Sequence, residues 1–440
     1  MFKPWSIRHL DLSAPLNAIE ATPDLGGTVL VFWYLDIPLG RRDVEAAELP
    51  ITVVQLREMA LAAVAPAVGD HLMDHGFRAP LPEKKPYRDA PPDFETLQSL
   101  DRPLDQVAAR VERAREDAPE DSVSVIVCTR ERPDALRTCL GALQKLDPAP
   151  DEVVVVDNAP QSDATRAVVE NFPEVQYVLE PTPGLSAARN AGLRHSTGAL
   201  VAFTDDDVLV HPTWMGRLRA AFADPEVMAV TGLVLPAELE TRAQLLFERN
   251  HAGFGWGFRA LDFDRGFSER MQRYAVPVWQ LGAGANMAFR RRVFADLGGF
   301  DERLGAGASG CSEDSEMWYR ILAHGGRCRY EPTAVVHHVH RRAMEGLDDQ
   351  MFQYMRGHIA ALLAQFEKHG HAGNLRRAFL TLPGYYGRWA LRRLRGPSGG
   401  PSLLGAQIRG CAAGFAYYLR HRTAAPAAPS VDPVHAPTTA

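Results

Sequence analysis

Short apolar segments alternate with segments of helical periodicity between residues 122 and 207. Strands are expected over 123–129, 153–157, 175–179 and 199–205, with helices from Pro133, over 164–170 and over 185–195. The second strand is too uniformly apolar to have a solvent face, which is typical of a sheet covered on both sides. This β-α-β-α-β-α-β order predicts an α/β fold with a Rossmann-like, mostly parallel sheet covered by helices.

Three consecutive carboxylates, Asp205, Asp206 and Asp207, follow the fourth apolar segment. If the backbone stays extended, Asp205 and Asp207 face one side and Asp206 the other. Buried carboxylates cost several kcal/mol unless they are neutralised, and hard oxygen ligands without His or Cys suit Mg²⁺ or Mn²⁺. The alternative is a helix N-terminus, where Asp is favoured, because Pro212 follows shortly.

Other polar residues fall at the expected carboxyl ends of strands, where open α/β sheets bind ligands. Thr129 and Asp157 follow adjacent strands and could meet the edge of a nucleotide base with a donor and an acceptor. The alternative is that Thr129 only ends a strand and Asp157 only caps a turn.

Composition narrows the classes of function. The net charge of −6 and a pI of about 6.2 argue against nucleic acid as the main partner, since counterion release needs a basic face. Five cysteines without metal-ligand spacing read as reduced thiols. No signal peptide is recognised, and no apolar run reaches the ~18 residues of a membrane-spanning helix. We therefore expect a cytoplasmic protein, soluble or peripheral at the inner face of the plasma membrane.

The chain divides into four expected regions. Residues 1–118 form an N-terminal α+β accessory region with a Pro-rich linker, and 119–345 the α/β domain. Residues 346–422 are helical, and 423–440 form a disordered tail rich in Ala and Pro. The C-terminal helices are expected to pack their apolar faces on the α/β domain. The alternative is peripheral contact with an anionic membrane. Its basic and aromatic residues would be Arg388, Trp389, Arg392, Arg393 and Arg395.

Six ordered motifs carry a resemblance to a known family. They are Val125-Ile126-Val127-Cys128-Thr129-Arg130, Val156-Asp157-Asn158, Gly184-Leu185-Ser186-Ala187-Ala188-Arg189-Asn190, Asp205-Asp206-Asp207, Gly284-Ala285-Asn286 and Glu313-Asp314. Residues 122–340 thereby resemble family 2 glycosyltransferases of the GT-A fold. The resemblance implies a nucleotide-sugar donor, with a UDP-sugar expected, a divalent metal and inverting transfer to a glycan or lipid-linked acceptor. The processive signature Q-x-x-R-W is absent after Asp314, so a non-processive enzyme is expected.

The resemblance also implies roles for individual carboxylates. Asp207 would hold the metal, and Asp205 would bind the ribose or the metal. Because three aspartates are consecutive, the motif could shift by one residue, and the role of Asp206 stays open. Asp314 would be the base that accepts the acceptor's proton, since it opens a helix after a glycine-rich loop, and Glu313 is the alternative. Without the resemblance, both would read as ordinary acids of a first helical turn.

Three basic residues complete the candidate site. Arg189 has donors that suit phosphate or a base carbonyl, although a helical Arg is often a solvated surface residue. Arg130 is a weaker donor-binding candidate. On a strand, His338 and His340 share a face, and His338 matches the family position that approaches metal or phosphate. Structural hydrogen bonding is the alternative for His338.

Two other classes of function share parts of this pattern. A nucleotidyltransferase also combines a parallel sheet, a nucleotide and Mg²⁺, but it usually carries a glycine-rich basic loop after the first strand, where this chain has Arg130-Glu131-Arg132-Pro133. A non-catalytic sugar- or nucleotide-binding module predicts loss of the carboxylates, and all of them are present.

Overall fold

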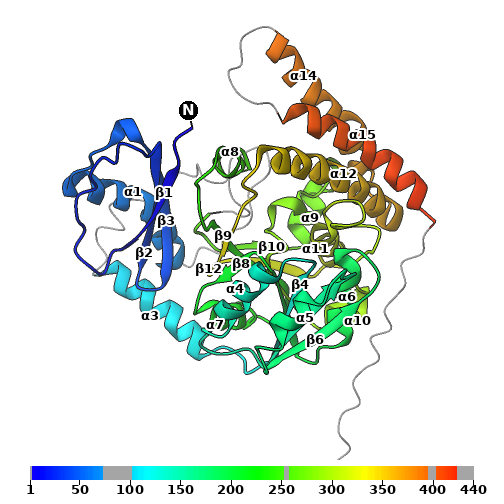
Figure 1. The fold of residues 1–440 in the computed structure, drawn as a ribbon, viewed down its shortest axis with the longest axis horizontal. Coiled ribbons are helices and arrows are strands. Elements are labelled where there is room, and N and C mark those ends of the chain that lie inside the picture. Colours follow the sequence, from blue (N-terminus) through cyan, green and yellow to red (C-terminus); the bar gives the residue numbers. More distant parts are fainter. Residues whose placement is uncertain (1, 73–101, 252–256, 395–402, 424–440) are drawn as a thin grey trace, which may run out of the picture.

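The computed structural model describes residues 2–72, 102–251, 257–394 and 403–423. The expected linker over 78–103 lies almost wholly, and the expected tail over 423–440 but for its first residue, outside these residues. So does most of an aromatic stretch at 254–258. Three parts are visible in Figure 1: an N-terminal sheet with its helices, a large central α/β body, and C-terminal helices on top of it.

The central body is built on one nine-stranded sheet with the order β10-β12-β9-β11-β7-β4-β5-β6, to which β8 adds by pairing with β12. Its strands are β4 (Val123–Thr129), β5 (Glu152–Asn158), β6 (Val175–Glu180), β7 (Leu200–Asp205), β8 (Val208–Val210), β9 (Val227–Pro236), β10 (Leu261–Phe263), β11 (Asn286–Arg290) and β12 (Arg327–His338). The neighbouring strands β7, β4, β5 and β6 are all parallel, as expected. Antiparallel β11 joins this half to the parallel pair β9 and β12.

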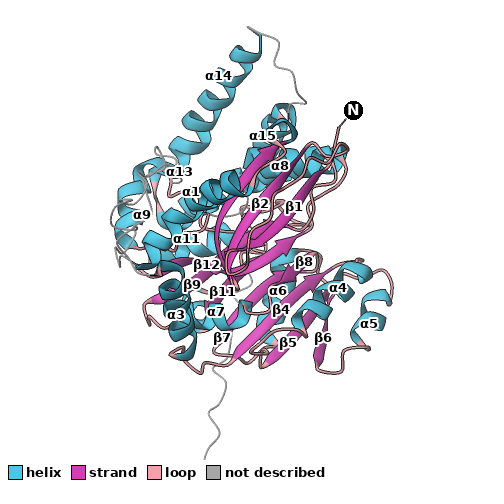
Figure 2. Cartoon of the chain, turned by 90° about the vertical axis from the view of Figure 1, so that its left-hand side faces the viewer, coloured by secondary structure: helices cyan, strands magenta, loops and turns pink. Residues whose placement is uncertain are grey.

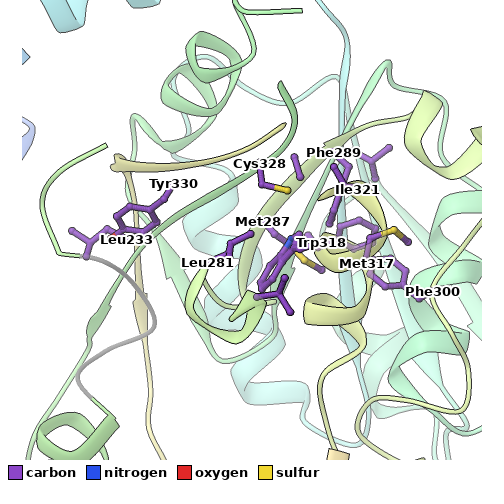
Figure 3. Close-up of a cluster of buried hydrophobic side chains, with 14 of the residues drawn as sticks. Leu233, Leu281, Met287, Phe289, Phe300, Met317, Trp318, Ile321, Cys328 and Tyr330 are labelled. Atoms are coloured by element: carbon purple, nitrogen blue, oxygen red, sulfur yellow. The ribbon is translucent and has the colours of Figure 1, made fainter. Parts of the chain in front are cut away.

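Helices cover both faces of this sheet (Figure 2). They are α4 (Pro133–Leu143), α5 (Ala164–Val169), α6 (Leu185–Arg194), α7 (Trp214–Ala221), α8 (Arg242–His251), α9 (Arg265–Met271), η3 (Gln272–Tyr274), η4 (Val278–Gln280), α10 (Arg292–Leu297) and α11 (Glu313–Ala323). One buried cluster, drawn in Figure 3, packs Trp318 of α11 among Met287, Leu281 and Phe289. Trp318 is fully buried, so it belongs to the core. The expected β-α-β-α-β-α-β unit is confirmed as β4 to β7.

The last strand, β12, begins at Arg327, and its pairing with β9 shifts register between Glu331 and Val335. Pro332 lies within that shift, and the irregularity accommodates a residue that cannot donate to the hydrogen-bond ladder. The strand ends at His338, so the expectation that His340 also lies on the strand is wrong.

The N-terminal part has its own sheet of β1 (Trp5–Asp11), β2 (Gly27–Tyr34) and β3 (Ile37–Glu45), with a separate core against its helices. The helices are η1 (Ala46–Glu48), α1 (Val53–Leu72) and α3 (Pro103–Glu116). β3 begins at Ile37, with two residues between it and the end of β2, and has Pro38 as its second residue. β3 is an edge strand of this sheet, where Pro38 is tolerated because its missing N–H faces no partner strand.

The N-terminal sheet docks on the central body through histidines. The ring of His9 lies 5.4 Å from that of His337, and Trp33 stacks on His211 at 5.4 Å. Trp33 Nε1 also donates to His9 Nδ1 at 3.0 Å. Burial, reinforced by the neighbouring His9 and His211, lowers the pKa of His337 from 6.5 to about 4.

This histidine contact makes the fold sensitive to acid. The unfolded chain protonates His337 near pH 6.5, but the folded chain does so only near pH 4, so stability is expected to fall as the pH drops across this window. Urea unfolding at several pH values should show a shallower acid dependence for His337→Phe than for the wild-type. The exposed His195→Phe variant serves as the control. Equal slopes for His337→Phe and the wild-type would contradict this account.

The C-terminal part is helical, with α12 (Met344–His369), α13 (Ala372–Arg376), η5 (Arg377–Thr381), α14 (Leu382–Leu394) and α15 (Leu404–His421). α12 packs on the loop before α11, where Gly357 lies so close to Cys311 that an added Cβ would lie 2.5 Å from the Cys311 carbonyl oxygen. α15 packs along α12 (Figure 1). Thus α12 and α15 pack as expected on the rest of the chain. None of the helices described is both long and apolar enough to cross a membrane.

Candidate active site

The candidate site lies where β4, β5 and β7 end at one edge of the sheet. Thr129 pairs in register with Asp157, and Cys128 pairs with Asp205. Because these strands are parallel neighbours, their carboxyl ends come together. The sequence prediction that Thr129, Asp157 and the aspartates meet at this edge is therefore confirmed.

The three aspartates point to three different sets of partners. β7 ends at Asp205, and Asp206 and Asp207 form the turn before β8. Asp206 is buried, and its carboxylate accepts hydrogen bonds from Thr129 Oγ1 at 2.7 Å and Arg132 Nη1 at 2.6 Å. The side chains of Asp205 and Asp207 are 32% and 18% exposed, against 4% for Asp206. Asp206 is thus tied to the end of β4, and Asp205 and Asp207 remain accessible.

The pKa values of these carboxylates differ with their partners. Burial raises the pKa of Asp206 to about 7, although Arg132 opposes the shift. Burial would also raise the pKa of Asp207, but its hydrogen bond to His338 and the charges of His338 and Arg132 hold that pKa below its ordinary value. Asp207 is therefore the most firmly ionised member of the turn.

Arg132 is a site residue that the sequence analysis missed. It precedes Pro133 at the start of α4, and its guanidinium bridges Asp206 and Asp207, with Nη2 lying 2.8 Å from Asp207 Oδ2. Arg130, the predicted candidate two residues earlier, is exposed. No spacing rule distinguishes the two arginines, because only the turn after β4 decides which one points at the acidic turn.

Arg189 on α6 joins the acidic turn to the start of α11. Its side chain is 2% exposed, so the alternative of a solvated surface residue is wrong. The guanidinium pairs with Glu313 and lies 3.5 Å from Asp205 Oδ1. It also lies against the rings of Phe203 and Phe300. Two acidic motifs more than one hundred residues apart in the sequence therefore share one buried cation.

Asp314 is next to this ion pair but differs from Glu313 in accessibility. Glu313 is buried against Arg189, whereas Asp314 is only partly buried, and Ser315 N donates to its Oδ1 at 2.6 Å. Burial raises the pKa of Asp314, and Arg189 partly offsets the shift. A Cβ on Gly284 would lie 3.2 Å from Asp314 Oδ2 and 2.8 Å from Arg189 Nη2, so this position admits only glycine without movement.

The glycine-rich loop before α11 is held by α6. Leu185 N donates to Ala306 O at 2.9 Å, and Ser186 Oγ donates to Leu304 O at 2.8 Å. Gly305 and Gly307 have φ values of +94° and +84°, which favour glycine. The loop therefore has a defined path that places Asp314 beside Arg189.

Asp157 has an unusual buried environment. The side chain is fully buried, and Tyr177 Oη donates to its Oδ2 at 2.9 Å. Its other oxygen, Oδ1, makes no hydrogen bond of normal geometry within the described residues. Burial raises the pKa of Asp157, and the hydroxyls of Tyr177 and Thr165 partly offset the shift. A buried acceptor of this kind is costly unless a ligand donates to it.

His338 begins a chain of contacts that leads away from the acidic turn. Its Nε2 lies 3.3 Å from Asp207 Oδ1, and its Nδ1 lies 3.0 Å from Nδ1 of His340. His340 Nε2 in turn lies 3.0 Å from Glu248, which pairs with Arg41 of β3. Because each ring nitrogen has a partner, the chain fixes the orientation of the His338 ring against Asp207.

The residues fit a divalent cation by charge and chemistry. The carboxyl groups of Asp205, Asp206, Asp207, Glu313 and Asp314 gather around two guanidinium groups and the ring of His338, so the site is rich in carboxylate oxygens. Within the described ranges, no three Asp, Glu, His or Cys side chains are arranged to hold a metal by themselves. Mg²⁺ and Mn²⁺ fit such a site because they take one or two carboxylates and complete their shell with phosphate oxygens and water. Asp207 and Asp205 are the accessible candidates.

Thr129 offers a test of the anchoring of Asp206. Thr129→Val removes the hydroxyl that donates to the buried carboxylate of Asp206, so it should destabilise the fold by about 1–3 kcal/mol. Thr129→Ser keeps the hydroxyl and should stay close to the wild-type in urea unfolding. If the valine variant is as stable as the serine variant, this hydrogen bond does not anchor the turn.

Comparisons with known proteins identify a family for part of the chain. Residues 124–298 match the family model of Glycosyl transferase family 2. A pre-mycofactocin glycosyltransferase of Mycobacterium tuberculosis is 29% identical over 226 residues, which are 50% of this chain and 43% of that protein. The succinoglycan biosynthesis protein ExoM of Rhizobium meliloti is 31% identical over 227 residues, 49% of this chain and 66% of that protein. The chain spans about half the length of the curated relatives it matches.

Among solved structures, a mannosyltransferase from Pyrobaculum calidifontis in complex with GDP-Man and Mn²⁺ is similar with a TM-score of 0.44 and 22% identity. The match covers 72% of this chain and 89% of that chain. The family match and the sheet with its ordered motifs make residues 124–298 a domain of glycosyltransferase family 2 with the GT-A fold.

Proposed function

We propose that the chain is a metal-dependent, inverting glycosyltransferase. It would move one sugar from a nucleotide-sugar donor, a UDP-sugar in the first instance, to a hydroxyl group of a glycan or lipid-linked acceptor. The observation that carries the proposal is the buried guanidinium of Arg189 between Asp205 and Glu313. This contact supports the view that the donor-binding turn at Asp205 and the first turn of α11, which carries the proposed base, belong to one site.

The donor would bind along the edge of β4, β5 and β7. Asp157 Oδ1, which makes no hydrogen bond of normal geometry among the described residues, is suited to accept from an N–H of the base. Asp205 would accept from the ribose, and Asp207 with Asp205 would hold Mg²⁺ or Mn²⁺. When bound, such a cation supplies positive charge to the diphosphate leaving group. Asp206 keeps the turn in place through Thr129.

Transfer would be a single displacement. The acceptor oxygen forms a bond to the anomeric carbon while the bond from that carbon to the donor's phosphate oxygen breaks. The nucleoside diphosphate leaves with the bonding electrons, and Asp314 takes the proton of the hydroxyl group. Its raised pKa favours this role, and its partial exposure leaves a path for the acceptor. Glu313 is less suited because it is buried and paired with Arg189.

A panel of nucleotide sugars with and without Mn²⁺ tests this proposal. We expect release of nucleoside diphosphate from at least one donor, and only with the cation present. Absence of both donor hydrolysis and nucleoside diphosphate binding across the whole panel would contradict it. Pyrophosphate release from a nucleoside triphosphate and a sugar phosphate would instead indicate a nucleotidyltransferase. Donor binding without turnover, with every acceptor tried, would indicate a binding module.

A further inference from the structure

The C-terminal helical segment differs sharply in charge from the rest of the chain. Residues 370–422 contain nine arginines and no lysine, aspartate or glutamate, while the whole chain has a net charge of −6. The arginines are Arg376, Arg377, Arg388, Arg392, Arg393, Arg395, Arg409, Arg420 and Arg422. A basic segment on an otherwise acidic protein is better explained by binding to an anionic partner than by a general need for solubility.

One side of the rod formed by α13, η5 and α14 is anchored to the protein. Ala378, Leu382 and Tyr386, each four residues apart, are buried in a cluster with Ile359 of α12 and with α15. The spacing places these three side chains on one helical face. The rod is therefore a fixed part of the structure, and its distal end projects beyond the central body in Figures 1 and 2.

The rod also exposes large apolar side chains. Leu380 is 68% exposed, Phe379 55%, Leu391 54%, Tyr385 49% and Trp389 42%. Five such residues within thirteen positions exceed the scattered exposure that is normal for a surface. Phe379 also contacts the ring of Phe415 on α15, with ring centroids 4.8 Å apart, so the exposed apolar surface of η5 and α14 is formed mainly by Leu380, Tyr385, Trp389 and Leu391.

Arginines are interspersed with these apolar residues. Arg376, Arg388 and Arg392 are exposed, and none forms an ion pair with another described residue. On α14, Arg388 and Arg392 lie four residues apart, as do Tyr385 and Trp389, so the two pairs share one side of the helix. Arg409 and Arg422 of the neighbouring α15 segment pair with acids, whereas Arg388 and Arg392 of α14 lie without an ion pair among the exposed apolar side chains.

The chemistry of this face selects one kind of occupant. Helices that lie in the interface of a bilayer typically carry Trp and Tyr beside Arg, with the aromatic rings among the lipid headgroups. A second copy of the chain would be a poor partner, because a two-fold contact through this surface would place the unpaired arginines of both copies in one interface. We propose that the exposed face of η5 and α14 docks on an anionic lipid bilayer as a peripheral, non-spanning anchor.

The anchor would hold the candidate active site near that surface. α12 packs against η5 and α14 at one side and against the loop before α11 at another, where Gly310 contacts Gln353. Close packing at both contacts would thus connect the anchor to the loop before α11. The membrane proposal does not depend on glycosyl transfer, since its test measures only binding to lipid.

Vesicle flotation with the full chain tests the proposal. We expect co-flotation with phosphatidylcholine vesicles that contain 30% phosphatidylglycerol, and little with phosphatidylcholine alone. Arg388→Glu with Arg392→Glu should weaken binding at least about 25-fold, since each basic residue near such a surface contributes about fivefold. Trp389→Ser with Leu391→Ser should also weaken it, through loss of apolar contact.

The matched control is Arg57→Glu with Arg270→Glu, which makes the same change of charge at two exposed arginines of α1 and α9. It should bind vesicles within about twofold of the wild-type by the same scale, and circular dichroism should show that all variants fold. Failure of the wild-type to float with anionic vesicles would overturn the proposal. So would equal loss in the control pair. A wild-type dimer in sedimentation that both α14 variants abolish, without lipid binding, would show that a second copy covers this face.

Discussion

Replacement of Asp314 by Asn is expected to lower the rate of sugar transfer by about 10²–10⁴-fold, the usual contribution of a positioned general base. The amide keeps the size and the backbone hydrogen bond of the aspartate but cannot take the acceptor's proton. Donor binding should remain near the wild-type level, because Asp314 contacts α11 and Arg189 and has no direct contact with the acidic turn. Single-turnover transfer with saturating donor and Mn²⁺ would measure the loss.

Asp296→Asn is a matched control for this variant. Asp296 is exposed on α10, outside the candidate site, and its replacement removes the same charge. It should leave the transfer rate unchanged. If Asp314→Asn retains a tenth or more of the wild-type rate while Glu313→Gln loses activity without unfolding, the base is Glu313 and the assignment here is wrong.

Replacement of Asp207 by Asn is expected to give the second large effect, a loss of at least about 10²-fold in transfer together with the loss of metal-dependent donor binding. Asp207 is the most firmly ionised residue of the turn, held so by His338 and Arg132. Its amide would bind a divalent cation weakly and leave the diphosphate unneutralised. Transfer measured across a range of Mn²⁺ concentrations should show a raised requirement for the cation.

The neighbouring Asp206 provides the contrast for this prediction. The amide of Asp206→Asn can still accept the hydrogen bond from Thr129. The side chain at this position is buried, so it would not contact the nucleotide-sugar donor directly. The Mn²⁺ concentration that Asp206→Asn requires should therefore be close to that of the wild-type. The concentration that Asp207→Asn requires should be clearly higher. A reversed order of the two variants would show that the register of the metal-binding aspartates is shifted by one residue.

Much of the catalytic fold was predictable because its signals are local. The apolar runs that became β4, β5 and β7 specify buried parallel strands by themselves, and their polar last residues specify the edge at which ligands bind. Strand periodicity does not explain the contact between His338 and His340, because β12 ends at His338 although the two ring nitrogens lie 3.0 Å apart. The extended pattern proposed for the three aspartates held only as far as Asp205, where β7 ends.

The contacts that organise the site are not local and were not predictable. Arg132 reaches the acidic turn from across a strand, and Arg189 became buried because Glu313 arrives from more than one hundred residues away. Their partners depend on tertiary packing, which leaves no periodic trace in the sequence. β1 was missed for a similar reason: it pairs in parallel with β2 although fifteen residues separate them, and its sequence Trp5–Asp11 is half polar.

The most direct test of the account is the affinity for UDP, measured by calorimetry with and without Mn²⁺, in the wild-type, Asp207→Asn and Asp314→Asn proteins. The account predicts that Mn²⁺ strengthens UDP binding in the wild-type and in Asp314→Asn but not in Asp207→Asn. If both variants bind UDP equally, with the same response to Mn²⁺, the division of the site into a donor-binding turn and a catalytic helix start is contradicted.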